Sequence, residues 1–260
     1  MNIAIIGTGY VGVVTGTCFA EGGHNVGCVD CDEDKVMLLQ GGGIPIYEPG
    51  LEEMVKKNVA DERLSFTAST SEGVEKSDVI FIAVPTPPLE DGSVDLSFIE
   101  RVARDIANAM TSYKIVVDKS TVPGKTGEKV AETIKRYCKE NCEFDVISNP
   151  EFLREGFAVE DLMKPDLIVL GSASDRPNES MRAIYEPFNA PIIFTDINSA
   201  ELIKHAANSF LAMKISYINA VAAICEASGA NVEEVANGIG MAARIGRRSV
   251  SYTHLRAHET

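Results

Sequence analysis

Two glutamates, Glu151 and Glu155, stand four positions apart directly after Pro150. Proline suits the first turn of a helix, so the spacing predicts that both carboxylates share one helical face. Neighbouring carboxylates raise the pKa of one partner, which then suits a general base. Acidic residues also favour helix N-termini for electrostatic reasons alone. A catalytic pair and a solvated helix start therefore both explain this pattern.

Lys204 and Asn208 form a second four-residue spacing, inside a long helical pattern. A cation and an amide on one face can stabilise a developing alkoxide and orient a sugar hydroxyl. A polar stripe facing water is the alternative interpretation. His205 reads as a surface or structural residue, and Cys225 as a core residue of the same helix. Apolar neighbours make the polar stripe narrow: Leu202, Ala206, Ala207 and Leu211.

A glycine motif, G-x-G-x-x-G, occupies Gly7, Gly9 and Gly12. It follows a short apolar run at 3–6, typical of a strand buried on both faces of a parallel sheet. A helical pattern continues through 13–20. The first glycine permits a tight turn, the second a close approach to a pyrophosphate, and the third close helix–strand packing. The N–H groups at the helix start would face the phosphates.

The context of this motif indicates which dinucleotide it binds. A second strand-like run, 24–29, ends in Asp30, which lies 18 residues after Gly12. An acidic residue at about this distance accepts hydrogen bonds from the adenosine ribose and repels a 2′-phosphate. The site therefore favours NAD over NADP. The alternative is an incidental aspartate after a glycine-rich turn, which explains less well why a strand, the glycines, a helix, a strand and an acidic residue follow in this order. Lys35 either contacts the cofactor or is a solvated lysine, and both interpretations stay open.

Strand-like and helical segments alternate along the chain to about residue 196, which predicts a parallel sheet with helices on both faces. The rigid segments at 85–88 and 120–124 follow two of the strands, at the sheet edge where ligands bind. The expected strands are 3–6, 24–29, 64–68, 78–84, 114–118, 144–147, 167–170 and 192–194. The expected helices between them include 34–39, 51–59, 96–110 and 126–137.

Helical periodicity without strands begins near residue 199, with helices expected at 201–228 and 232–236. The predicted fold class is α/β: a Rossmann-like, doubly wound parallel sheet in 1–197, followed by the start of an all-helical central domain in 198–247. Residues 248–260 show no apolar period and hold two of the four histidines. This pattern indicates a truncated reading frame or a non-native tail, and 248–260 is expected to be a non-native tail.

Composition narrows the class of protein. The chain has 260 residues and a formal net charge of −14, which argues against nonspecific binding to nucleic acid or to an anionic membrane. No continuous apolar run reaches membrane-spanning length, and the first residues read as a strand rather than a signal peptide. A cytoplasmic enzyme is expected.

The six cysteines include a C-x-x-C at Cys28 and Cys31 and a C-x-x-x-C at Cys138 and Cys142. A four-thiolate zinc site is one interpretation. Reduced thiols that serve as small apolar packing residues are the preferred one, so no metal is expected.

The sequence resembles the UDP-glucose/GDP-mannose dehydrogenase family from residue 1 to about 246. Several motifs in one order are far more specific than any one of them. They are G-T-G-Y-V-G at 7–12, I-Y-E-P-G-L at 46–51, V-P-T-P-P at 84–88, S-T-V-P-G at 120–124, N-P-E-F-L-R-E-G at 149–156, K-P-D at 164–166, E-L-I-K-H-A-A-N at 201–208 and R-I-G at 244–246.

The resemblance implies roles for individual residues. It implies that NAD contacts Gly7, Thr8, Gly9, Tyr10, Val11, Gly12, Asp30, Lys35, Val84, Pro85, Thr86, Pro87, Ser120, Thr121, Val122 and Glu155. It implies that a nucleotide sugar contacts Glu151, Phe152, Leu153, Arg154, Glu155, Lys204, Asn208 and Arg244. The residues expected to act in catalysis are Glu151 as the general base, Lys204 as the oxyanion-stabilising cation, Asn208 and Thr121.

The resemblance also implies a reaction and marks one departure from it. The family uses two successive hydride transfers to NAD to oxidise a C6 hydroxyl, here most readily that of UDP-glucose to UDP-glucuronate. Its nucleophilic cysteine lies in a G-G-x-C-x-x-K-D motif, which this sequence does not contain. The chain is therefore expected to be an N-terminal portion that is inactive alone, with a homodimer contact along 199–228.

Other readings stay open. GDP-mannose and UDP-N-acetylmannosamine are alternative substrates. A β-hydroxyacid dehydrogenase also pairs a dinucleotide domain with a Lys/Asn helix, although the N-P-E-F-L-R-E-G segment argues against it. A noncatalytic NAD-binding module is the alternative from outside the enzymes.

Overall fold

The structure is a computed structural model that describes residues 1–139 and 142–246. The predicted non-native tail, 248–260, lies outside the described residues. The chain divides into two compact units, Met1–Leu202 and Ile203–Thr260. The boundary between them falls inside one long helix.

An eight-stranded sheet forms the centre of the first unit, in the order β3-β2-β1-β4-β5-β6-β7-β8. β1 (Asn2–Ile6) pairs in parallel with both β2 (Asn25–Val29) and β4 (Val79–Ile82). The chain builds outward from β1 to one edge and then from β4 to the other, so a switch point lies between these two strands, where ligands bind in such sheets. The other strands are β3 (Leu64–Thr67), β5 (Lys114–Asp118), β6 (Phe144–Ser148), β7 (Ile168–Ser172) and β8 (Ile192–Thr195).

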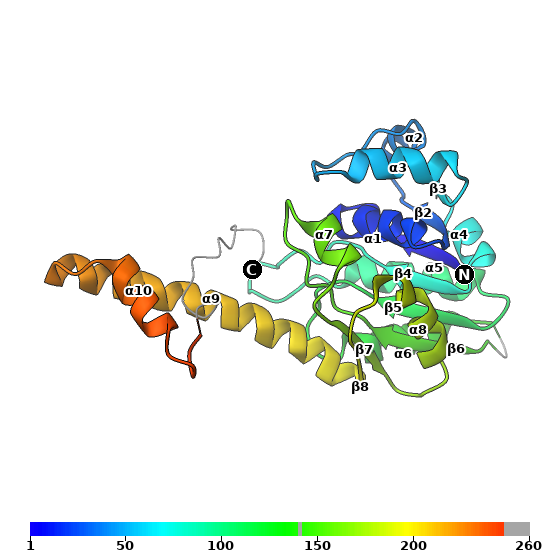
Figure 1. The fold of residues 1–260 in the computed structure, drawn as a ribbon. Helices are drawn as coiled ribbons and strands as arrows, with labels where there is room; N and C mark the ends of the chain where they lie inside the picture. Colours follow the sequence, from blue (N-terminus) through cyan, green and yellow to red (C-terminus); the bar gives the residue numbers. More distant parts are fainter. Residues whose placement is uncertain (140–141, 247–260) are drawn as a thin grey trace. The chain divides into compact units, whose positions relative to one another are not determined.

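Helices cover both faces of this sheet (Figure 1). On one face, α1 (Tyr10–Glu21) packs against α3 (Leu51–Ala60) and α7 (Ala158–Met163). On the other face, α5 (Ser97–Ala109) packs between α4 (Thr70–Lys76) and α6 (Thr126–Tyr137). The remaining short helices of this unit are α2 (Glu33–Gln40), α8 (Asn178–Tyr185) and the 3-10 turn η1 (Glu186–Phe188).

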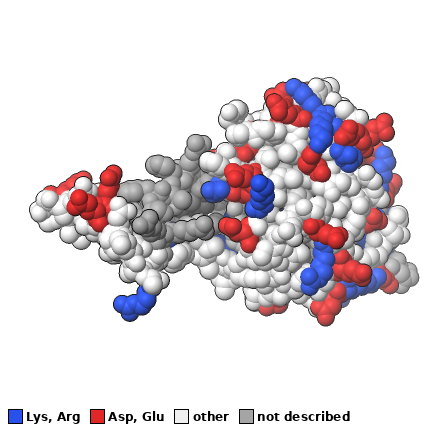
Figure 2. Space-filling view, viewed as in Figure 1, with Lys and Arg blue, Asp and Glu red and all other residues white. Residues whose placement is uncertain are grey.

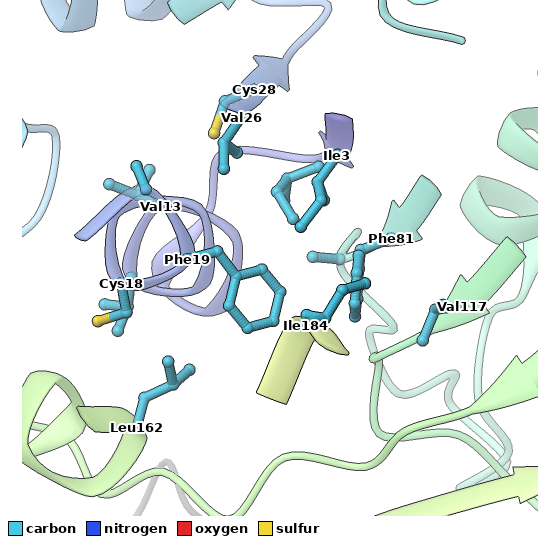
Figure 3. Packing of buried hydrophobic residues seen from close by; sticks show 14 of the residues in the cluster. Ile3, Val13, Cys18, Phe19, Val26, Cys28, Phe81, Val117, Leu162 and Ile184 are labelled. Carbon is cyan, nitrogen blue, oxygen red and sulfur yellow. The ribbon is translucent and has the colours of Figure 1, made fainter. Parts of the chain in front are cut away.

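Side-chain alternation along the strands gives the sheet two separate apolar layers. In β1, Ile3 and Ile5 enter one buried cluster, while Ala4 and Ile6 enter the other. This follows from the two-residue repeat of a strand. Figure 3 shows Phe19 of α1 at the centre of the first cluster, facing Phe81 and Ile184. A Phe→Ala change at such a position costs about 3–5 kcal/mol.

The doubly wound α/β prediction is confirmed, with one correction to the direction of the last strands. β6 and β7 pair antiparallel, and β8 is parallel to β7. The helix between β6 and β7 has six residues and spans only about 9 Å. A five-residue strand is about 16 Å long, so α7 does not carry the chain back across the sheet. β7 therefore starts at the carboxyl end of β6 and runs antiparallel to it.

The second unit consists of the larger part of α9 (Ile197–Ser228), a turn, and α10 (Val232–Gly240). Gly229 takes a φ of +75° and ends α9. The side chain of Asn231 accepts hydrogen bonds from the N–H groups of Glu233 and Glu234 and so caps α10. The helix expected over 232–236 thus extends four residues further.

Polar and charged residues interrupt α9, so this helix is not a continuous apolar run. By length and composition alone, α9 is nevertheless long and apolar enough to cross a membrane, with 32 residues and a mean hydropathy of 1.4 in an 18-residue window. Buried core helices of soluble proteins meet the same criteria, whereas 11 % of this window of α9 is buried. Its large exposed apolar side chains are Leu202, Phe210, Met213, Tyr217 and Ile224.

The cysteines differ in part from the expectation of reduced packing thiols. Cys18, Cys28 and Cys225 are buried and free, as packing residues should be. Cys138 and Cys142 instead form a disulfide between the end of α6 and the start of β6, and Cys31 is exposed. The described residues contain no group of three or more side chains suited to a metal ion.

Candidate functional site

The loop between β1 and α1 shows why glycine occupies two of its positions. Gly7 has a φ of +103°, and a Cβ there would lie 2.4 Å from the carbonyl oxygen of Ala83 in the neighbouring β4 segment. A Cβ on Gly12 would lie 1.8 Å from the carbonyl oxygen of Gly7. Both glycines are therefore required by the fold itself, because the loop, the helix and the sheet are in backbone contact here.

Gly9 is different. A Cβ added to it would meet no atom within 4 Å, and its φ of −71° suits any residue. No neighbouring atom among the described residues requires a glycine at this position. The open space leaves room for the close approach of a pyrophosphate to the backbone, which stays a prediction of the motif.

The N-terminus of α1 starts at this glycine, and no side chain of the described residues caps it. Gly9 occupies the N-cap position without a side-chain hydrogen bond, and the first turn contains no acidic residue. The first N–H groups of a helix have no partner within the helix and carry a partial positive charge. This end of α1 can therefore hold an anion such as a pyrophosphate.

Asp30 follows β2 and lies beside the glycine loop. Its Oδ2 accepts hydrogen bonds from the N–H (2.9 Å) and hydroxyl (2.6 Å) of Thr8 and from Nζ of Lys35 (3.0 Å). Burial opposes ionisation, but these bonds and one from the N–H of Asp32 outweigh it, so the pKa of Asp30 is lowered. The site thus holds a fixed negative charge, and Lys35 pairs with that charge.

Two further loops meet at the carboxyl ends of β4 and β5. The hydroxyl of Thr86 donates to the carbonyl of Thr121 (3.0 Å), and the hydroxyl of Ser120 donates to the carbonyl of Val84 (3.2 Å). These bonds join 84–88 to 120–122, the two segments expected to line the cofactor. Pro85 and Pro87 are exposed, whereas Val122 is buried.

Asp118 lies directly beneath these loops, at the end of β5, and is 1 % exposed. Its Oδ1 accepts the N–H of Ser120 (3.0 Å), while Oδ2 has no hydrogen-bond partner in the described part of the chain. Burial, and then the nearby Glu201 carboxylate, raise the pKa of Asp118 to about 7.

The expected helix over Glu151 and Glu155 is wrong. Residues 149–154 are irregular, 155–157 form a turn, and α7 begins at Ala158. The Glu151 carboxylate accepts the N–H of Leu153 (2.6 Å), a local bond that competes with helix formation. Gly156 has a φ of +84°, which interrupts any helix. The two glutamates therefore do not share one helical face, although both lie in one short loop at the carboxyl edge.

The remaining predicted members of this loop differ in environment. Phe152 and Leu153 are half-buried, and Arg154 is exposed. The guanidinium of Arg154 pairs with Asp161 of α7 at 2.6 Å and stacks on the ring of Phe157. Arg154 therefore closes the turn before α7.

Glu48 is a residue of this site that sequence reasoning missed. Its carboxylate, 3 % exposed, accepts hydrogen bonds from Tyr10, Gly156 and Ala158. In the sequence, I-Y-E-P-G-L served only as a motif of the family resemblance, and Glu48 was given no role. A glutamate in a turn before an amphipathic helix was the available signal, but Gly156 and Ala158 are 108 and 110 residues away.

Asn149 was also missed as a contributor. Its side chain donates to the carbonyl of Val169 (2.9 Å) and accepts from Nζ of Lys119 (3.2 Å) and from the hydroxyl of Tyr185. All these groups are buried. This network fixes the start of the loop that carries Glu151 to the end of β5.

The second unit carries the other predicted residues. Lys204 and Asn208 lie one turn apart on α9; Lys204 is buried and Asn208 half-buried. Arg244 follows α10 and is exposed. Joint action of these three residues with Glu151 stays a prediction.

Glu201, which belongs to the first unit, is buried and was not predicted. Its Oε2 accepts the N–H of Lys125 (2.6 Å) and its Oε1 the N–H of Gly127 (2.8 Å). Burial raises the pKa of Glu201 despite these bonds. The start of α9 is thereby attached to the start of α6.

A cavity of about 480 Å³ does not coincide with this site. It is lined by the first residues of β1 and β2, by β3 and by the end of α4, at the amino edge of the sheet. Figure 2 shows basic and acidic side chains intermixed on the visible face of the first unit, without a large basic patch on that face.

Comparison with known proteins matches both parts of the chain to one family. Residues 1–189 match the NAD-binding domain of the UDP-glucose/GDP-mannose dehydrogenase family, and residues 198–254 match its central domain. The chain belongs to the UDP-glucose/GDP-mannose dehydrogenase family. The family prediction is confirmed, and so is NAD as the cofactor, since the matched domain is the family's NAD-binding domain.

Relatives in this dehydrogenase family show high similarity over a limited length. UDP-glucose 6-dehydrogenase of Bacillus subtilis is 50 % identical over 247 residues, covering 95 % of this chain and 54 % of that protein. A solved UDP-glucose dehydrogenase from Pyrobaculum islandicum superimposes with a TM-score of 0.92 at 41 % identity, covering 95 % and 58 % of the two chains. GDP-mannose dehydrogenase from Pseudomonas aeruginosa gives 0.91 at 35 % identity, covering 98 % and 59 %. The chain spans somewhat more than half the length of these relatives.

Proposed function

We propose that this chain provides the NAD site and part of the sugar site of an enzyme that oxidises the C6 hydroxyl of UDP-glucose to UDP-glucuronate. The observation that carries the proposal is Gly9. It is a glycine that the fold does not need, at the uncapped start of α1, and the loop holding Glu151 and Glu155 is attached to that helix start through Glu48.

Different residues of this chain hold the different parts of the cofactor. Bound NAD supplies the hydride acceptor. The N–H groups at the start of α1 hold the pyrophosphate, and Asp30 holds the adenosine ribose. The joined loops 84–88 and 120–122 flank the rest of the cofactor. Thr121 acts in catalysis, and Glu155 contacts NAD. The other NAD contacts proposed here are Gly7, Thr8, Tyr10, Val11, Gly12 and Lys35.

The sugar side needs a base and a cation. Glu151 accepts the proton of the C6 hydroxyl as hydride leaves the carbon. Lys204 stabilises the developing alkoxide, and Asn208 orients the hydroxyl. Arg244 and residues 152–155 bind the nucleotide sugar.

UDP-glucose is the preferred substrate over GDP-mannose or UDP-N-acetylmannosamine. Two similar proteins carry UDP-glucose dehydrogenase names, while a structure of nearly equal TM-score acts on GDP-mannose. The fold alone does not separate these sugars, so the preference rests on sequence identity. A cytoplasmic location and a homodimer formed along α9 complete the proposal.

A substrate and cofactor panel tests the proposal. Calorimetry is expected to show tighter binding of NAD than of NADP, and Asp30→Ala should remove the discrimination while the exposed control Asp34→Ala retains it. The cofactor-loaded chain is then offered UDP-glucose, GDP-mannose, UDP-N-acetylmannosamine and β-hydroxyacids. NADH formed from a hydroxyacid, without any response to nucleotide sugars, would refute the proposal.

The 260 residues contain no G-G-x-C-x-x-K-D motif, which holds the family's nucleophile. Covalent capture of an aldehyde divides one difficult oxidation into easier steps. The chain is therefore expected to bind NAD but to form little UDP-glucuronate, as read by mass spectrometry of the sugar nucleotide. Acid formed at about one turnover per second or faster would show that another cysteine serves, and Cys225→Ser would test the first candidate.

A further inference from the structure

Glu48 is a buried carboxylate held by neutral donors. Its Oε2 accepts the hydroxyl of Tyr10 and the N–H of Gly156 (2.9 Å), and its Oε1 accepts the N–H of Ala158 (2.8 Å). It forms no ion pair among the described residues. The N–H of Val159 is a fourth, longer donor to Oε1 (3.5 Å). A buried charge is costly unless hydrogen bonds compensate it, so the donors and the carboxylate depend on one another.

Each donor belongs to a different part of the proposed site. Tyr10 is the first residue of α1 and lies within the glycine motif. Gly156 ends the loop that carries Glu151 and Glu155, and Ala158 begins α7. The hydroxyl of Tyr10 also accepts the N–H of Gly156 (3.1 Å). Glu48 thus joins the helix start that faces NAD to the far end of the sugar-binding loop.

The near end of the same loop is fixed independently. Asn149 is held by Lys119, Tyr185 and Val169. Between the two ends, Glu151 accepts the N–H of Leu153 within the loop, and Arg154 binds Asp161 of α7. The geometry of 150–156 therefore depends on both ends, and the bonds of Glu48 and Tyr10 to Gly156 connect the far end to the start of α1.

We propose that Glu48 is a positioning residue that transmits NAD binding at the start of α1 to the loop 151–156. The inference rests on the proposed NAD site and adds a coupling between cofactor and sugar segments. Glu48 does not contact either ligand in this scheme. NAD orders the start of α1, Tyr10 is held in place, and Glu48 keeps Gly156 and Ala158 at a fixed distance from it.

The test follows amide exchange of the peptide 152–163 and of the peptide 7–14, with and without NAD. In the unmodified chain, NAD is expected to slow exchange in both peptides. Glu48→Gln replaces one carboxylate oxygen with an NH₂ group, which cannot accept hydrogen bonds from the donors that face it. Amide hydrogen exchange at Gly156 and Ala158 should therefore become roughly tenfold faster in the free protein. NAD should then still protect 7–14 but no longer protect 152–163.

Glu53→Gln is the matched control, because Glu53 is exposed in α3; it should behave as the unmodified chain. Tyr10→Phe removes the hydroxyl that donates to Glu48 and accepts the N–H of Gly156, while the N–H bonds to Glu48 remain. It should weaken the NAD response of 152–163, and an unchanged response would overturn the coupling even if Glu48→Gln does not fold.

The outcomes separate the two proposals. Failure of NAD to protect 7–14 in the unmodified chain overturns the proposed function and the coupling together. Protection of 7–14 without any effect on 152–163 overturns the coupling alone. An unchanged NAD response of 152–163 in Glu48→Gln or Tyr10→Phe also overturns it, because the connection would then not run through this carboxylate.

Discussion

At the residue scale, the three glycines of the β1–α1 loop divide into two kinds. Gly7 and Gly12 are dictated by backbone contacts within the chain, whereas Gly9 meets open space. The G-x-G-x-x-G motif by itself does not distinguish these two kinds of glycine. Their substitution should therefore separate folding from ligand binding.

Gly9→Ala is expected to change the free energy of unfolding by no more than about 1 kcal/mol relative to the unmodified chain. It should weaken NAD binding tenfold or more, because its methyl group occupies the pyrophosphate position. Gly12→Ala should instead destabilise the fold by several kcal/mol or prevent folding, because its Cβ would lie 1.8 Å from a carbonyl oxygen. Urea unfolding and calorimetry measure the two effects. Unchanged NAD affinity in Gly9→Ala would place the pyrophosphate elsewhere.

Asp118 makes stability depend on pH. Its pKa is raised from 3.8 to about 7 by burial, so the folded state holds a proton that the unfolded state has released. Below pH 4, Asp118 makes its full contribution to the free energy of unfolding. This contribution, at most a few kcal/mol, is lost as the pH rises from 4 toward 7. Asp118→Asn should flatten this part of the pH profile of urea unfolding. Parallel profiles for the two proteins would show that Asp118 ionises normally.

At the scale of elements, buried glutamates from distant segments bind the starts of two helices, α6 and α7. Glu48 binds the start of α7, and Glu201 binds the start of α6. Each helix start lies directly after a loop of the candidate site. The loops are therefore fixed less by their own sequences than by carboxylates supplied from elsewhere in the chain.

Glu201→Ala is expected to destabilise the first unit by about 2 kcal/mol or more, because it leaves the buried N–H of Gly127 and that of Lys125 without their acceptor. Glu132→Ala, at an exposed position of α6, is the control and should change stability by less than about 0.5 kcal/mol. Urea unfolding gives both values. Equal stability of the two variants would show that α6 does not need this cap.

At the scale of the whole molecule, α9 has an apolar stripe. Phe210, Met213, Tyr217 and Ile224 are exposed, and their spacing of three, four and seven residues places them on one helical face. An exposed stripe of this kind favours association. It fits the proposed homodimer, and it also explains why α9 resembles a membrane-crossing helix in composition.

Met213→Lys, which places a charge at the middle of this stripe, is expected to shift the chain toward the monomer in light scattering and analytical ultracentrifugation. Met213 is 56 % exposed, so the change should cost little stability. Asn219→Lys adds the same charge on the opposite side of the helix and should leave association unchanged. A monomer over a wide concentration range before any substitution would argue against the dimer.

The sequence by itself determined the parts that depend on short-range patterns. Apolar runs, helical periodicity and the glycine spacing predicted the strands, most of the helices, the dinucleotide loop and the position of Asp30, because period and chain sterics act over a few residues. The same reasoning placed Glu151 and Glu155 on a helix. That was wrong, because Glu151 binds a nearby amide instead and Gly156 takes a positive φ.

Only the tertiary structure decided which distant groups complete the site. Glu48 reaches Gly156 across 108 positions, and Glu201 reaches Gly127 across 74. No local pattern encodes such pairs, because a buried carboxylate is stable only where folding brings N–H donors to it. The direction of β7 was decided in the same way. It depends on how far α7 carries the chain across the sheet, which is a property of the packed fold and not of any one segment.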